Sequence, residues 1–196
     1  MTRPLDKRRG PCAPQPAPSA QSGPGSPEPF LLEILARLPR AGLALDVAAG
    51  RGRHSLVLAR TGITVVAIDS SVCALGTLVR AAREQDLRVC ALAADLSDFP
   101  LPADAFDVIV NINFLDRDLV PRLKQALKPG GFLLFDTFLV EQAEIGKPRN
   151  PAYLLRHREL RELLSGLELL EYREGLAGPH DGRRAWRACA LALKRN

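Results

Sequence analysis

The feature that most constrains the fold is an alternation of short apolar runs and amphipathic stretches between residues 44 and 138. The apolar runs have the length of buried strands, and the stretches between them carry the three-to-four-residue spacing of helices. Strands are predicted at 44–47, 63–68, 87–92, 106–110 and 132–138, and helices at 54–60, 71–84 and 119–127. Because helices between buried strands imply parallel crossover connections, the pattern predicts a doubly wound α/β sheet.

The two ends of this region differ from its middle. Residues 30–38 follow helical spacing up to Pro39, and a second helix is predicted at 159–165. Residues 167–174 and 185–193 then read as two strands joined by a polar loop that contains Gly178 and Gly182. No helix fits between them, so they should pair as an antiparallel hairpin. The expected architecture is a mostly parallel seven-stranded sheet with a C-terminal antiparallel hairpin.

Residues 1–29 have a different composition from the rest of the chain. They contain eight of the 16 prolines, with Ala, Ser, Gly and Gln between them. Such a segment forms no backbone ladders and buries little apolar area, so it is predicted to be a disordered leader, with one folded domain at 30–196. The spacing of Pro11 and Pro14 would also suit a polyproline II ligand, although an irregular leader is the simpler interpretation.

Composition narrows the function classes. The formal net charge is +5, and residues 1–29 hold four basic and two acidic side chains, which leaves +3 for the domain. That charge is too small to indicate a nucleic-acid partner. The four cysteines lie far apart, so neither zinc spacing nor a disulfide framework is indicated, and no metal is expected. Cys73, Cys90 and Cys189 lie in apolar stretches and are expected to be reduced core thiols. No apolar run is long enough to span a membrane, and the simplest localisation is cytoplasmic.

A small-residue loop follows the first predicted strand. Asp46 lies at the strand's carboxyl end, where open α/β sheets bind ligands, and Ala48, Gly50 and Gly52 follow at alternate positions. Glycine permits positive φ and removes the Cβ that would keep a ligand from the backbone. A helix is predicted to begin about two residues later, so its free N–H groups would face the ligand. A glycine-rich turn without a ligand is the alternative.

Acidic residues follow the next two strands. Asp69 comes 19 residues after Gly50 and is placed to accept both hydroxyls of a ribose, or else to cap a helix together with Ser70 or Ser71. Asp95 follows the third strand and is placed to accept from an exocyclic amine such as that of adenine, while the N–H of Leu96 serves a ring nitrogen. Asp95 would otherwise be an ordinary loop residue.

The segment Asn111-Ile112-Asn113 follows the fourth strand. Its amides could orient the amino-acid part of a cofactor or a substrate, or simply form a turn. One polar signal at each successive strand end favours a single nucleotide-like cofactor site over four unrelated loops.

Three stretches resemble the class I S-adenosylmethionine-dependent methyltransferases. The segment Leu45–Leu56 looks like that family's first motif, most of all in the branch of the bacterial tellurite-resistance methyltransferases. Phe106–Val110 is similar to the fourth-strand motif, and Leu127–Leu133 to the proline-glycine turn before the fifth strand. The terminal hairpin is similar to the family's antiparallel sixth and seventh strands. The resemblance covers residues 30–196 and implies S-adenosyl-L-methionine as the cofactor.

The resemblance also implies individual roles. Gly50 and Gly52 would approach the methionyl part of the cofactor, Asp69 would hold the ribose and Asp95 the adenine amine. Arg53 and His54 would lie near the cofactor's carboxylate, unless they are only a solvated helix start.

The sequence also departs from the family pattern. Ala48 stands where glycine is usual; alanine favours negative φ, so the loop is expected to lie slightly farther from the cofactor. No Asn-Pro-Pro-Tyr follows the fourth strand, which argues against amino-methylation of adenine or glutamine.

The acceptor is less well marked. Lys147, Arg149, Asn150 and His157 follow the fifth strand and would suit an anion, or would be a solvated loop. A small-molecule acceptor such as a thiol, an oxyanion or a metabolite is expected, because the cofactor carries the reactive group and no fixed triad is needed. Asp116, His157 and His180 are candidate general bases, without preference among them.

Two other functions fit parts of the pattern. A catalytically silent S-adenosylmethionine-binding or interaction module would tolerate Ala48 and the proline-rich leader. An NAD(P)-dependent oxidoreductase would use Gly50-x-Gly52-x-x-Ser55 as an imperfect dinucleotide motif. Asp46 and the terminal hairpin argue against the oxidoreductase. Oligomeric state is left open.

Overall fold

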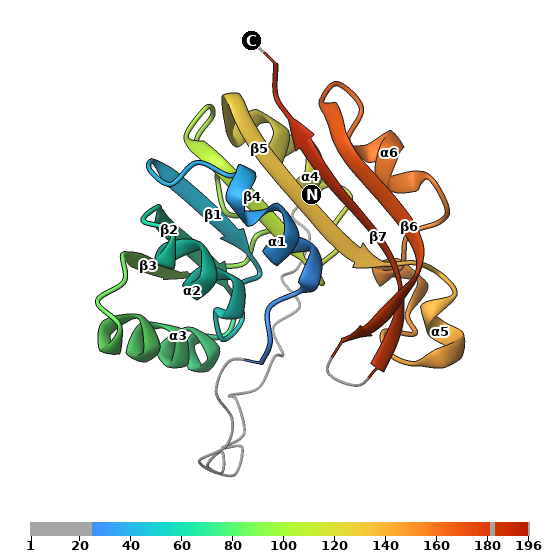
Figure 1. Cartoon of the computed structure of the whole chain (residues 1–196), viewed down its shortest axis with the longest axis horizontal. Coiled ribbons are helices and arrows are strands. Elements are labelled where there is room, and N and C mark those ends of the chain that lie inside the picture. Colours follow the sequence, from blue (N-terminus) through green and yellow to red (C-terminus); the bar gives the residue numbers. More distant parts are fainter. Residues whose placement is uncertain (1–24, 181–182, 196) are drawn as a thin grey trace, which may run out of the picture.

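The computed structural model describes residues 25–180 and 183–195 as one sheet with helices on both faces (Figure 1). The expectation of a disordered leader falls largely on residues 1–24, which lie outside the described residues. The strands are β1 (Leu43–Val47), β2 (Thr64–Asp69), β3 (Val89–Ala93), β4 (Phe106–Ile112), β5 (Leu127–Phe138), β6 (Glu168–His180) and β7 (Arg183–Leu193). The helices are α1 (Pro29–Ile34), α2 (Arg53–Arg60), α3 (Val72–Glu84), α4 (Leu119–Ala126), α5 (Gln142–Ile145) and α6 (Glu159–Leu163), with 3-10 turns η1 (Leu35–Arg37) and η2 (Pro151–Tyr153).

The seven strands have the order β3-β2-β1-β4-β5-β7-β6. The pairs from β3 to β5 are parallel, and β7 is antiparallel to both β5 and β6. The predicted fold class, a doubly wound and mostly parallel sheet closed by an antiparallel hairpin, is therefore confirmed. Because the parallel strands all end at one edge, the loops after β1, β2, β3 and β4 meet there.

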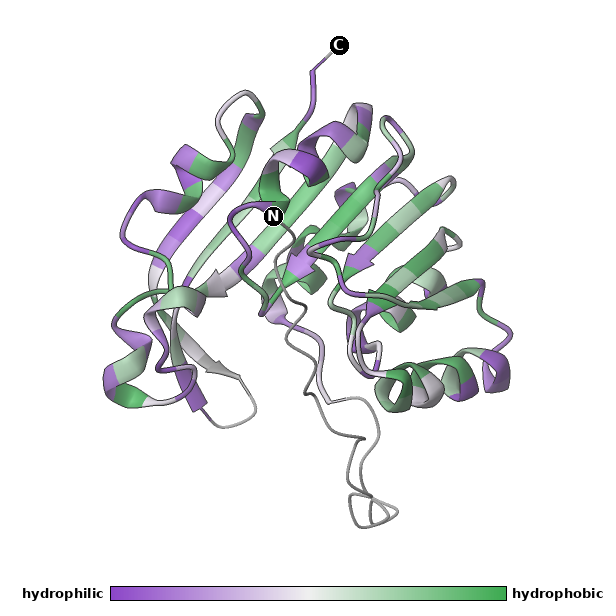
Figure 2. Cartoon of the chain, turned by 180° about the vertical axis from the view of Figure 1, so that it is seen from behind, coloured by the Kyte–Doolittle hydropathy of each residue, from purple (hydrophilic) through white to green (hydrophobic). Residues whose placement is uncertain are grey.

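Alternation along the central strands creates two cores. In β4, Ile109 packs with β5, α4 and α6, whereas Val108 and Val110 pack with α1 and α2 on the opposite face. A third, smaller cluster joins α2 and α3 through Leu56, Leu75 and other residues. Figure 2 shows the middle of the sheet mainly in hydrophobic colours. Strands buried on both faces explain why the sequence reads as continuous apolar runs.

The boundaries differ from the sequence expectation at three places. β5 begins at Leu127, so the Pro129-Gly130-Gly131 turn lies within it. β6 and β7 run through most of the expected polar loop, as far as His180 and from Arg183. The short α5 and η2 were not predicted, because four or three residues carry too little periodicity to detect.

The N-terminal boundary of the domain also moves. Glu28 was assigned to the leader, yet only 5% of its surface is exposed, and Pro29 begins α1. The proline-rich composition predicts a leader up to residue 29. Because α1 packs on the sheet, however, the residues directly before it are also held against the domain. The packed domain therefore includes Glu28 and Pro29.

The three described cysteines do not all lie in the core. Cys73 and Cys90 are free but exposed, and Cys189 is half-buried, so the expectation of core thiols is wrong for the first two. Cys90 lies on the edge strand β3, which has a neighbour on one side only. Within residues 25–180 and 183–195, no helix is long and apolar enough to cross a membrane.

Candidate functional site

The loop after β1 is held in the left-handed region of backbone space. The φ angles are +52° at Ala48, +56° at Gly50 and +79° at Gly52, and α2 begins at the next residue. Ala48 therefore has the positive φ that alanine adopts less readily than glycine. Ala49 N–H donates to the Ile68 carbonyl (3.0 Å) and Gly52 N–H to the Ala49 carbonyl (2.9 Å), so the neighbouring bonds impose the turn.

The two glycines of this loop have different surroundings. A Cβ on Gly50 would meet nothing within 4 Å, so its Cα faces open space. A Cβ on Gly52 would lie 2.1 Å from Cδ1 and 2.7 Å from Cγ of Leu78, a fully buried residue of α3. Gly50 therefore leaves room for a ligand, whereas Gly52 leaves room for the packing of α3 against the loop.

Asp69 ties the loop to the end of β2. Its Oδ2 accepts a hydrogen bond from the Gly50 N–H (2.7 Å), and its Oδ1 accepts from the Ser71 N–H (2.8 Å). The ribose and capping interpretations are therefore compatible, since a carboxylate has about four acceptor sites. Ser71 caps α3 by accepting from Ala74 N–H (3.3 Å), while Ser70 is exposed. The hydrogen bond between Gly50 and Asp69 thus joins two predicted site residues that lie 19 residues apart in the sequence.

Asp46 lies behind the loop. It is 1% exposed, and its Oδ2 accepts from the Ser55 hydroxyl at 2.5 Å, which joins the end of β1 to α2. Burial raises the pKa of Asp46 to about 7, although the Ser55 hydrogen bonds and the Arg53 charge oppose the shift. Its place indicates that it positions the loop and α2 rather than lining a cavity.

At the third and fourth strand ends, Asp95 is exposed, whereas Leu96 and Asn111 are buried. Asp95 is exposed, and its Oδ1 accepts from the backbone N–H (3.0 Å) and the hydroxyl (2.5 Å) of Ser97. Leu96 is buried, and its carbonyl accepts from Arg122 Nη1 (2.9 Å). Asn111 is buried and donates to the Phe114 carbonyl (2.8 Å), which is the turn role that the sequence left open.

Two cavities lie at this edge of the sheet. The smaller, about 320 Å³, is lined by the glycine loop together with Arg53, His54, Ile112 and Asn113. The larger, about 1850 Å³, lies on the β5–β7 side, between α1, α5 and the end of the hairpin. Arg53 and Asn113 line both cavities, so these two residues form the partition between them.

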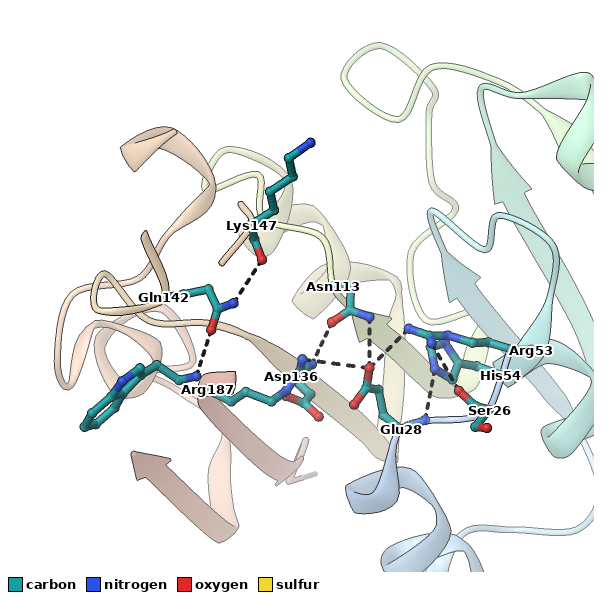
Figure 3. Close-up of polar contacts among 10 residues, drawn as sticks. Ser26, Glu28, Arg53, His54, Asn113, Asp136, Gln142, Lys147 and Arg187 are labelled. Atoms are coloured by element: carbon teal, nitrogen blue, oxygen red, sulfur yellow. Dashed lines mark hydrogen bonds and ion pairs between the residues drawn. The ribbon is translucent and has the colours of Figure 1, made fainter. Parts of the chain in front are cut away.

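A buried ionic network occupies this partition (Figure 3). Glu28 Oε1 accepts from Arg53 Nη2 (3.1 Å) and Asn113 Nδ2 (3.0 Å), and lies 3.8 Å from Arg187 Nη1. Arg187 also donates to Asp136 Oδ1 (2.8 Å) and Asn113 Oδ1 (2.7 Å), and its guanidinium stacks on Phe138. The network links the N-terminal segment, α2, β4, β5 and β7.

Burial in the network changes the pKa of Asp136, and further hydrogen bonds join Arg53 and His54 to the N-terminal segment. Burial raises the pKa of Asp136 to about 6, against the opposing effect of Arg187. Glu28 N–H donates to His54 Nε2 (3.4 Å), and Arg53 Nη1 donates to the Ser26 carbonyl (3.1 Å). Arg53 and His54 therefore lie beside the smaller cavity, but both contact the N-terminal segment.

The four residues that were predicted to suit an anion do not lie together at one cavity. Lys147 and Arg149 line the larger cavity, whereas the Asn150 side chain accepts from Ala152 N–H (3.0 Å) and caps η2. His157 bonds through Nδ1 to Glu174 (2.9 Å) and through Nε2 to Glu141, and these carboxylates raise its pKa. Both ring nitrogens of His157 therefore contact carboxylates of the protein itself, and His157 does not line the larger cavity.

Two of the three candidate bases, Asp116 and His157, line neither cavity. Asp116 accepts from Asp118 N–H (3.0 Å) before α4, and it lines neither cavity. The side chain of His180 lies outside the described part of the chain. In the described residues, no group of three or more His, Cys, Asp or Glu could hold a metal ion.

Sequence reasoning missed Glu28, Asp136 and Arg187. Asp136 could have been found, because it ends β5 as Asp46 and Asp69 end β1 and β2. Glu28 carried no signal beyond a proline-rich context. Arg187 lies within a strand, where a charge gives no indication of its partner.

Comparison with known proteins agrees with this geometry. Residues 44–131 match the methyltransferase domain family. The chain is 41% identical over 100 residues to a demethylmenaquinone methyltransferase of Clavibacter sepedonicus, covering 48% of this chain and 40% of that protein. It is 25% identical over 143 residues to a probable S-adenosyl-L-methionine-dependent methyltransferase, TehB, of Haemophilus influenzae, covering 69% of this chain and 49% of that one. The chain thus spans about half or less of the length of these relatives.

The fold is shared over a longer stretch. The crystal structure of TehB from Haemophilus influenzae superposes with a TM-score of 0.74 at 22% identity, covering 86% of this chain and 62% of that one. The family match includes the glycine loop, Asp69, Asp95 and Asn111, and the structural match extends the likeness to most of the chain. Residues 44–131 therefore match a methyltransferase domain family, and most of the chain has the same fold as TehB.

Proposed function

We propose that the protein transfers a methyl group from S-adenosylmethionine to a small-molecule acceptor. The observation that carries this proposal is the pair of cavities that meet at Arg53 and Asn113. One cavity rests on the glycine loop, and the other is large enough for a small ligand, since ligand pockets usually measure about 300–1,000 Å³. A two-substrate transfer needs two adjoining sites of this kind.

The residues of the smaller cavity and its surroundings fit the cofactor. The open space at Gly50 is a cradle that a Cβ would fill, and Asp69 is fixed beside it with acceptor capacity to spare. We propose that Asp69 holds the ribose hydroxyls, that Asp95 and Leu96 N–H hold the adenine, and that Ala48 and Gly50 bound the methionyl part. When bound, the cofactor supplies a methyl group activated by a sulfonium.

The other predicted residues take supporting roles in this proposal. Asp46 and Gly52 are buried behind the loop and hold it in place, and Asn111 fixes the turn after β4. Arg53 and His54 adjoin the smaller cavity and are the groups nearest to the methionyl end.

The chain's own contribution to the reaction is alignment and exclusion of water. Asn113 has its left-handed backbone conformation (φ +60°) and both of its amide atoms fixed, by Glu28 and Arg187. Asp136 and Glu28 are buried carboxylates of the larger cavity, and a pKa of about 6 leaves Asp136 largely ionised at neutral pH. Asp136 is therefore the residue best placed to accept a proton from a neutral acceptor. A thiolate or oxyanion acceptor would need no base.

Ligand-dependent thermal unfolding tests this proposal. A ligand at 100-fold excess over its Kd stabilises the native state by about 2.7 kcal/mol. The Tm should rise with S-adenosylmethionine or its demethylated product and stay unchanged with NAD(H) or NADP(H). Asp69→Asn should reduce the Tm shift. Glu84→Gln, which removes the same charge from an exposed residue of α3, should retain the shift. A shift with the nicotinamide cofactors alone would refute the proposal.

A silent binding module is the competing function, and binding alone does not exclude it. Transfer of labelled methyl to a panel of thiols and of selenium and tellurium oxyanions separates the two. Tight cofactor binding without transfer to any acceptor in the panel would favour the silent module. Asp136→Asn provides a further check, because it should slow transfer to neutral acceptors more than transfer to anions.

A further inference from the structure

Some charged side chains of the larger cavity form ion pairs, and others have no ion-pair partner among the described residues. All four of its carboxylates are paired: Glu28 with Arg53, Glu33 with Arg173, Asp136 with Arg187 and Glu174 with His157. Four further cations line the same cavity, and none has an ion-pair partner among residues 25–180 and 183–195. They are Lys147, Arg149, Arg183 and Arg184.

Two of these cations, Arg183 and Arg184, lie on the part of β7 beyond the partition. β7 makes its last pair with β5 at Arg187 and then continues for four residues to Arg183, paired only with β6. At about 3.3 Å per residue, Arg183 lies about 13 Å along the strand from the buried network. In Figure 3 the Lys147 side chain extends away from Gln142 and the rest of the network. The cavity is therefore electroneutral at the buried network, its inner end, and positive at Arg183 and Arg184, its outer end.

Apolar side chains also line the cavity. Phe138, Ile145 and Trp186 line the cavity, and Leu176 is a large apolar side chain that is 45% exposed. An inorganic oxyanion would use the cations and leave this apolar surface in water. An apolar molecule without charge would leave the cations without a counter-ion.

We propose that the methyl acceptor is an organic anion with an apolar body, whose carboxylate or phosphate binds at the outer cations while its nucleophile lies at the inner end. This inference rests on the proposed function and adds the acceptor's chemical class and orientation. The separation of about 13 Å requires an elongated molecule. A cavity that combines apolar side chains with an electroneutral inner end favours a small organic anion over a nucleic acid, which needs a continuous basic surface along its backbone.

Direct binding to the full chain tests the inference, with the demethylated cofactor present. The probes are biphenyl-4-carboxylate, its neutral carboxamide and acetate, measured by calorimetry. The carboxylate should bind at least tenfold more tightly than either the carboxamide or acetate. Arg149→Gln combined with Arg183→Gln should weaken the carboxylate about tenfold, as two charge-assisted contacts would. The same double variant should leave carboxamide binding unchanged.

A matched control removes the same charge elsewhere. Arg80→Gln combined with Arg83→Gln changes two exposed arginines of α3 and should leave carboxylate binding unchanged. Equal affinity for carboxylate and carboxamide, or equal weakening by both double variants, would overturn the inference. A short oligoribonucleotide that binds more tightly than the carboxylate would overturn it in favour of an RNA acceptor.

The demethylated cofactor provides an independent readout. Its affinity should be the same in wild type and in both double variants. If it fails to bind wild type, the proposed function fails. If it binds while the carboxylate preference is absent, only the present inference fails.

Discussion

Replacing Gly52 by alanine should unfold the protein far more readily than the same change at Gly50. Both residues have positive φ, at which an L-residue costs about 1–2 kcal/mol. Alanine also restricts the unfolded chain, which returns about 0.4–1 kcal/mol. Gly50→Ala, whose Cβ meets open space, should therefore cost about 1 kcal/mol.

Gly52→Ala adds a steric conflict to this strain. The new Cβ would lie 2.1 Å from Cδ1 and 2.7 Å from Cγ of Leu78, which is fully buried and has little room to move. Overpacking of a core costs about 1–3 kcal/mol, so the total should be about 2–4 kcal/mol. Against a typical stability of about 5–15 kcal/mol, this is a large fraction.

Urea unfolding without ligand measures both changes. A double-mutant cycle isolates the clash, because Leu78→Ala removes the atoms that the new methyl would meet. In that background Gly52→Ala should cost no more than Gly50→Ala does in wild type. An unchanged cost for Gly52→Ala with and without Leu78 would refute the packing argument. Gly50→Ala should instead weaken binding of S-adenosylmethionine.

Three further predictions follow from other contacts. Ala48→Gly should stabilise the chain by up to about 1 kcal/mol in urea unfolding, since it relieves left-handed strain at φ +52°; a loss of stability would contradict this. Glu174 and Glu141 raise the pKa of His157, so its ion pairs should stabilise the fold below the ordinary histidine pKa, and this stabilisation should be lost as pH rises through the raised pKa. A plot of Tm against pH should show the loss, and the His157→Gln variant should not show it. Asp46 has its pKa raised from 3.8 to about 7 by burial, so stability should fall as pH rises through that interval; an Asp46→Asn variant with an unchanged Tm–pH curve would count against this assignment.

Local periodicity accounts for the parts of the fold that the sequence predicted. Strand and helix spacing repeats within a few residues, and a strand buried on both faces must be apolar throughout, so residues 44–138 reveal the parallel strands without knowledge of their neighbours. The loop from Asp46 to Gly52 and the acids at 69 and 95 could be placed at one edge, because parallel strands all end there. The absence of a helix between the last two strands was enough to predict their antiparallel pairing.

Long-range contacts decided the rest. Gly52 faces Leu78, and Glu28 joins Arg53 and Asn113, so these contacts depend on partners between 25 and 85 residues away. The place of β7 between β5 and β6 depends on the strand order. Glycine and glutamate carry no mark in the sequence of which neighbour they will meet. The sequence therefore determined where a glycine loop lies, whereas only the tertiary structure decided which residues of the loop face open space and which support the core. It also decided which cations of the larger cavity have no ion-pair partner among the described residues.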